Sequence, residues 1–83
     1  MAFVLLGTQA CHLCEEAQAL LLHFQGQIRQ DLFLEDIAES EQQVARYGER
    51  IPVLLDEDSG DELGWPFDLP KLEEWLRKHK ALH

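Results

Sequence analysis

The most informative part of this chain is residues 3–14, which read FVLLGTQACHLC. The apolar run at residues 3–6 predicts a buried strand, and the polar residues after it predict a turn. Cys11 and Cys14 then open a stretch whose apolar residues recur at helical spacing as far as Phe24. The sequence therefore predicts a strand, a turn and a helix, with a Cys-x-x-Cys motif where the helix begins.

A cysteine at the beginning of a helix has distinctive chemistry. The unpaired N–H groups and the positive end of the helix dipole stabilise a thiolate there relative to the thiol. Cys14 follows Cys11 by about one turn, so it is placed to attack a mixed disulfide formed at Cys11. We therefore take Cys11 and Cys14 as the candidate catalytic residues.

Length and composition indicate one globular domain over residues 1–83. Such a chain is near the lower size limit for folding alone, and its two cysteines are too few for the disulfide framework of a small secreted scaffold. The residues before the first turn lack the basic region of a signal peptide, and no apolar run approaches the roughly 20 residues of a membrane span. We expect a soluble monomer in the reducing cytoplasm.

The net charge of −9 comes from 16 acidic and 7 basic side chains. Binding to nucleic acid needs clustered lysine and arginine, and only residues 71–80 hold such a cluster, interrupted by Glu73 and Glu74. We therefore expect neither a nucleic acid nor a membrane as partner. The acidity mainly favours solubility, and a positively charged protein partner is the alternative.

The middle of the chain predicts a second strand and a second helix. The first helix should run to about Phe24 and end near Gly26, a residue common after helix C-termini. A strand is expected within residues 28–37, parallel to the first strand because a helix separates them. Residues 36–47 predict a short helix that ends at Gly48.

The C-terminal third predicts a hairpin and a last helix, giving the order βαβαββα. The apolar run that ends at Leu55 is the third strand, with Pro52 as its first residue, where a missing N–H is tolerated. Residues 56–61 form a turn, and residues 62–65 form the returning strand. Asp68 is a favourable N-cap for the last helix.

The last helix has its apolar residues on one face: Leu69, Leu72, Trp75, Leu76 and His79. Basic residues near its end suit the negative pole of the helix dipole. We nevertheless expect His79, like His23 and His83, to be a surface residue with no role in the site.

Together these motifs resemble a glutaredoxin-like member of the thioredoxin superfamily, in particular a branch of small proteins with a Cys-His-Leu-Cys motif. The matching pieces are the Cys-x-x-Cys at the first helix, Tyr47-Gly48, Ile51-Pro52-Val53, and the segment from Gly64 to Asp68. The resemblance implies an α/β, thioredoxin-like fold, with a four-stranded mixed sheet and helices on both faces. It also implies thiol–disulfide oxidoreductase activity through Cys11 and Cys14.

The resemblance further implies where substrate binds. In the family the equivalent of Pro52 is cis and faces the redox pair, and backbone groups beside it can pair with an extended thiol substrate. The substrate-binding residues carried over in this way, together with the residues between the cysteines, are His12, Leu13, Ile51, Pro52, Gly64, Trp65 and Asp68. A protonated His12 would favour the Cys11 thiolate by its charge, whereas Glu15 and Glu16 would oppose it.

Glutathione is a thiol that glutaredoxins use as reductant or co-substrate. Asp68 matches the family residue that meets the glutathione amino group. Thr8 stands where a basic residue often precedes the motif, and Trp65 stands where the family has the second glycine of a Gly-Gly pair. We therefore expect a disulfide-containing protein or a small thiol as partner, with glutathione as one candidate, and no tightly bound cofactor.

Two other classes of function stay open. A metal site built on Cys11, His12 and Cys14 would need an outside fourth ligand, and no second ligand pair is present, so we predict no resident metal. An iron–sulfur cluster shared between two chains through glutathione is one alternative. A non-catalytic adaptor that keeps the thioredoxin-like fold is the other.

Overall fold

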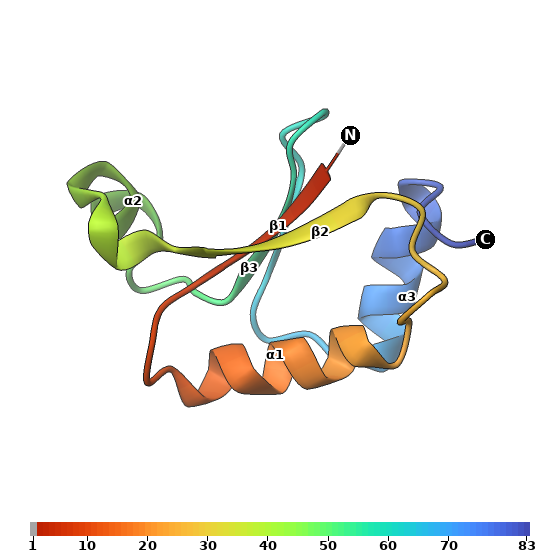
Figure 1. Cartoon of the computed structure of the whole chain (residues 1–83), viewed down its shortest axis with the longest axis horizontal. Helices are drawn as coiled ribbons and strands as arrows, with labels where there is room; N and C mark the ends of the chain where they lie inside the picture. The colour runs from red at the N-terminus through yellow and green to blue at the C-terminus, as the bar shows by residue number, and fades with distance from the viewer. Residues whose placement is uncertain (1) are drawn as a thin grey trace.

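The computed structural model describes residues 2–83, which form a four-stranded sheet flanked by helices (Figure 1). None of the helices in this described part of the chain is long and apolar enough to span a membrane. In chain order the elements are β1 (Ala2–Gly7), α1 (His12–Leu22), β2 (Asp31–Asp36), the 3-10 turn η1 (Ile37–Glu39), α2 (Glu41–Tyr47), β3 (Val53–Asp56), β4 (Glu62–Gly64) and α3 (Leu69–Lys78).

The sheet has the strand order β2-β1-β3-β4. β1 and β2 are parallel, as expected for strands joined by a helix, and the other two pairs are antiparallel. The predicted βαβαββα order and mixed four-stranded sheet are therefore confirmed.

Two apolar cores lie on the two faces of the sheet. Because side chains alternate along a strand, β1 sends Phe3 and Leu5 to the face covered by α1 and α3. Val4 and Leu6 point to the opposite face, where they pack with Tyr47 of α2. The prediction of helices on both faces is confirmed, and β1 is the strand common to both cores.

The first helix is shorter than predicted. Cys11 is its N-cap rather than its first helical residue, and the helix ends at Leu22 instead of Phe24. Turn residues follow as far as Gln27, and among them Gly26 has a φ of +81°, a conformation that glycine adopts without steric cost. This turn redirects the chain toward β2.

The second strand and second helix also differ from the prediction. Ile28, expected within the strand, makes only an isolated antiparallel bridge to Leu82, and β2 begins at Asp31. The helix expected over residues 36–47 is divided because Ser40 caps α2, its Oγ accepting a hydrogen bond from the Gln43 N–H at 3.2 Å. Local capping thus outweighs a continuous helix here.

The prediction that His79 is a surface residue is wrong. Its side chain is only 11% exposed, with Nδ1 3.0 Å from Asp56 Oδ2 and Nε2 2.7 Å from Asp61 Oδ2. The imidazole also packs against Trp75 and Phe3, with ring centroids 4.3 and 6.4 Å away. His79 is largely covered because it continues the apolar face of α3, and its two carboxylate partners hold α3 against the β3–β4 hairpin.

A second polar network joins the end of α2 to β4. The Tyr47 hydroxyl donates a hydrogen bond to Glu62 Oε2 at 2.8 Å, and Arg50 forms an ion pair with the same carboxylate. Arg50 first, and then Tyr47, hold the pKa of Glu62 below its ordinary value. The hydrogen bond to Glu62 in turn raises the pKa of Tyr47. The hairpin is therefore tied to a helix on each face of the sheet.

Candidate active site

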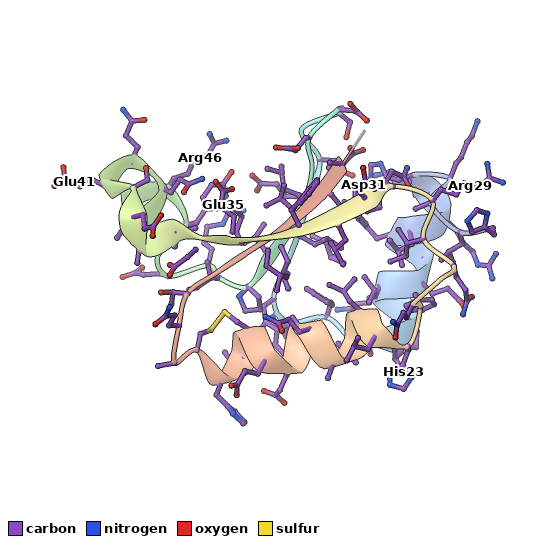
Figure 2. The ribbon with its side chains drawn as sticks, viewed as in Figure 1. His23, Arg29, Asp31, Glu35, Glu41 and Arg46 are labelled. Carbon is purple, nitrogen blue, oxygen red and sulfur yellow. A yellow bond between two sulfur atoms is a disulfide. The ribbon has the colours of Figure 1, made fainter. Side chains whose placement is uncertain are left out.

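Cys11 and Cys14 form a disulfide at the beginning of α1, drawn as the yellow bond in Figure 2. Their Cα atoms are 5.2 Å apart. Cys11 has an extended backbone (φ −98°, ψ 104°), and its Sγ accepts a hydrogen bond from the Cys14 N–H at 3.1 Å. The Cys11 sulfur thus takes the place of an N-cap oxygen and faces the unpaired N–H groups of the helix.

The two cysteines differ in exposure. Cys11 is half-buried, whereas only 4% of Cys14 is exposed. Cys14 packs closely on Gly7, since a Cβ added to that glycine would lie 3.0 Å from Cys14 Sγ and 3.3 Å from Cys14 Cβ. The absence of a side chain at Gly7, which sequence reasoning did not single out, therefore makes room for the buried sulfur.

One end of the sheet brings several loops together around the disulfide. Gly7, from which the loop to Cys11 departs, lies opposite Asp36 at the end of β2. Pro52 immediately precedes β3, which runs antiparallel to β1, so it lies at the same end. The Trp65 N–H donates to the Pro52 carbonyl at 3.1 Å. The disulfide therefore has Pro52 and Trp65 on one side, which we call the proline flank. Asp36 lies on its other side, which we call the β2 flank.

On the proline flank, several main-chain groups are already in use. The Ile51–Pro52 and Trp65–Pro66 peptide bonds are cis, and the Pro52 side chain is fully buried. The Ile51 N–H donates to the Tyr47 carbonyl at 3.0 Å, while the Pro52 carbonyl accepts from Trp65. Two main-chain groups beside the proline are therefore already bonded within the chain.

The residues between the cysteines are exposed. The His12 side chain is 85% exposed, and its Nδ1 lies 3.7 Å from Glu15 Oε2, a pairing that contributes little in water. Leu13 is 43% exposed. Both side chains are accessible to a partner that approaches the disulfide. No group of three or more His, Cys, Asp or Glu side chains in residues 2–83 is arranged to hold a metal ion.

The segment before α3 has mainly structural contacts. Trp65 is half-buried and packs edge-on against Phe67, with centroids 5.0 Å apart. Asp68 is exposed, and its Oδ1 accepts a hydrogen bond from the Lys71 N–H at 3.0 Å, so it is the N-cap of α3 as predicted. Gly64 is exposed at the end of β4.

The open space beside the disulfide lies on the β2 flank. A cavity of about 360 Å³ is lined by both cysteines and, among others, by Glu15, Leu34, Glu35 and Asp36. Neither Pro52 nor Trp65 lines it. Sequence reasoning did not assign Leu34, Glu35 and Asp36 to the site, although the predicted parallel pairing already puts the end of the second strand beside the beginning of the first helix.

Comparison with known proteins agrees with this architecture. Residues 2–77 match a family model described as a Glutaredoxin-like domain (DUF836). The X-ray structure of the structural genomics target protein XcR50 from X. campestris is 36% identical, with a TM-score of 0.80 over 92% of this chain and 96% of that chain. Its solution structure gives 37% identity and a TM-score of 0.79 over 100% and 99% of the two chains.

A second similar protein is Ne2328 from Nitrosomonas europaea. Its solution structure is 29% identical, with a TM-score of 0.73 over 89% of this chain and 88% of that chain. No curated protein matches the sequence. Because the family model spans nearly the whole chain and the solved structures share its fold, the chain belongs to the glutaredoxin-like domain family, within the thioredoxin superfamily.

Proposed function

We propose that this protein is a thiol–disulfide oxidoreductase whose redox pair is Cys11 and Cys14. The observation that carries the proposal is the position of the Cys11 sulfur at the N-cap of α1, where it accepts the Cys14 N–H and is still partly exposed. Hydrogen bonding from a helix N-terminus favours the thiolate over the thiol. Once the pair is reduced, Cys11 is therefore the expected nucleophile.

The proposed reaction uses both sulfurs in turn. The Cys11 thiolate attacks a substrate disulfide, bonding to one substrate sulfur and releasing the other as a thiolate. The Cys14 thiolate then attacks Cys11 Sγ and releases the second substrate thiolate. The substrate has gained two electrons, and the protein holds the Cys11–Cys14 disulfide. We assign the first attack to Cys11 because Cys14 is buried against Gly7.

An external thiol must restore the reduced pair. Two molecules of glutathione, which leave as their disulfide, or one dithiol would supply the two electrons, and a reducing cytoplasm is the compartment that suits this cycle. The substrate would be a disulfide-containing protein or a small disulfide. The exposed His12 and Leu13 side chains would contact it first.

The test is a thiol titration combined with turnover of bis(2-hydroxyethyl) disulfide. We expect a Cys11 pKa clearly below the roughly 8.5 of a free cysteine. Cys11→Ser should reduce turnover to the uncatalysed rate, and Cys14→Ser should accumulate the mixed disulfide at Cys11. A Cys11 pKa at or above the free value, with no reversible bridge in a redox buffer, would instead identify a non-catalytic adaptor.

A further inference from the structure

The cavity beside the disulfide continues away from the redox pair. A second cavity of about 370 Å³ is lined by apolar residues of α1, the following turn and β2, including Leu22, Phe24 and Leu32. Both cavities are lined by Gln18 and Leu34, so they are adjacent sections of one channel. We call this channel the α1–β2 groove. It is acidic where it reaches the disulfide and apolar at its other end.

β2, yellow in Figure 1, is the outer strand of the sheet on this side. Among residues 2–83 it pairs only with β1, which leaves the main-chain groups of its outer edge free. Leu32, Phe33 and Leu34 are 37%, 54% and 61% exposed. Natural proteins usually cover or charge such an edge, because it can pair with a strand of another chain.

The register shows how side chains of an added strand would be placed. Leu32 and Leu34 lie opposite Phe3 and Leu5 of β1, so they point to the α1 face, toward the groove. Phe33 and Glu35 point to the other face. The centre of a strand added to β2 would therefore contact Leu32 and Leu34 on one face of the sheet and Phe33 on the other.

The charged residues that line the groove are all acidic. Glu15 and Asp36 line the section at the disulfide, together with Glu35, whose side chain extends from the outer strand toward the opposite face. No lysine or arginine of residues 2–83 lines either section. Figure 2 shows Asp31 and Glu35 toward opposite ends of β2. An added strand with lysine or arginine at these ends would be complementary, and an acidic strand would be repelled.

A second copy of this chain fits poorly. Two β2 strands related by a two-fold axis are antiparallel, and pairing centred between Phe33 and Leu34 puts Asp31 opposite Asp36 at both ends. Like charges directly opposite in a strand pair are destabilising. This repulsion favours as partner a different chain with the opposite charge.

We propose that the α1–β2 groove binds an extended segment of the substrate protein, with an apolar centre and flanking lysine or arginine residues, as an additional strand on β2. The inference rests on the oxidoreductase activity proposed above and names its substrate class. The substrate disulfide lies just beyond the Glu35–Asp36 end, next to Cys11. Main-chain pairing supplies affinity, and the acidic residues select the partner. The proline flank offers fewer free main-chain groups, as described above.

The experiment compares two peptide disulfides as substrates of the reduced protein. One is the symmetric disulfide of a peptide with lysine–valine–leucine–valine–lysine followed by glycine and cysteine, and the other has glutamate in place of lysine. Both are also made with the cysteine at the opposite end. Protein dithiol and peptide disulfide give protein disulfide and two peptide thiols. We expect kcat/KM at least about tenfold higher for the lysine peptide in one orientation, with a ratio that decreases as salt is added.

Variants test whether the preference for the lysine peptide arises from residues of the groove. In Leu22→Ser/Leu34→Ser, the rate for the lysine peptide divided by the rate for bis(2-hydroxyethyl) disulfide should fall about tenfold because the apolar contacts are lost. Val44→Ser, which changes an apolar residue on α2 that is 45% exposed and lies outside the groove, should leave this ratio unchanged. Glu15→Gln/Glu35→Gln should reduce the lysine-over-glutamate preference, whereas Glu49→Gln/Glu57→Gln, with the same change in net charge, should not.

The outcomes separate this inference from the proposed function. Turnover of the small disulfide without any preference between the peptides would overturn the inference and leave the activity standing. If neither disulfide is reduced, peptide binding to Cys11→Ser/Cys14→Ser, measured by fluorescence anisotropy, decides the inference alone. Selective binding of the lysine peptide that Leu22→Ser/Leu34→Ser abolishes would support it. A dimer of the wild-type chain in light scattering, lost in Leu34→Ser, would overturn it in favour of a second copy.

Discussion

At one edge of the sheet, the β3–β4 hairpin is tied to α3 through His79 and to α2 through Tyr47, whereas at the other edge β2 pairs with β1 and exposes three consecutive apolar side chains. The hairpin and α3 contribute Leu54, Leu72, Trp75 and Leu76 to the buried residues of the larger core, whereas β2 contributes none. This difference indicates that stability comes mainly from the hairpin side. The β2 side is therefore free to serve binding next to the redox pair.

The largest difference should appear when the same truncation is made on the two sides. Leu72 is fully buried in α3, and Leu34 is 61% exposed on β2. Leu72→Ala should lower the free energy of unfolding by about 2–5 kcal/mol, because it leaves a cavity in the core. Leu34→Ala should change it by about 0.5 kcal/mol or less, as expected for an exposed position. Urea unfolding measures both, and similar losses would contradict the distinction between the sides.

A smaller effect is expected from the polar tie between α3 and the hairpin. His79→Ala removes both contacts to Asp56 and Asp61, and Asp56 is itself only 7% exposed. We expect a loss of about 1.5–3 kcal/mol, the usual range for hydrogen bonds to charged groups. His23→Ala, at an exposed position after α1, is the matched control. If the two variants lost equal stability, the tie would contribute nothing.

The smallest expected effect is the loss of folding stability at acid pH. The hydrogen bond from His79 holds the pKa of Asp61 below its usual value of 3.8, and Arg50 does the same for Glu62, usual value 4.5. A carboxylate with a lowered folded pKa contributes stability that is present above its unfolded pKa and is lost as the pH falls through the folded pKa. We therefore expect the hairpin side to weaken as the pH falls below about 4.5.

Unfolding curves collected between neutral and acid pH test this expectation. In Asp61→Asn the decrease of stability with falling pH should be shallower than in the wild type, because one titrating group has been removed. Asp31→Asn, on the open edge, should follow the wild-type slope. A wild-type stability that stays constant through the acid range would refute the contribution of these carboxylates.

The sequence by itself determined the order of the elements, the parallel pairing of β1 and β2, the N-cap at Asp68 and the position of the cysteine pair at the beginning of a helix. These features depend on local periodicity, capping and connection length, which a few neighbouring residues specify. The family match over residues 2–77 agrees with that local information.

Tertiary structure alone decided which strand became the open edge and which polar residues were buried. Helical spacing put His79 on the apolar face of α3, but its partner Asp61 is 18 residues away, so no local pattern showed that carboxylates would bind the imidazole there. The apolar residues of β2 would be expected in a core, yet they are exposed because β2 is the outer strand of the sheet. Burial depends on contacts between distant segments, and those contacts exist only once the chain has folded.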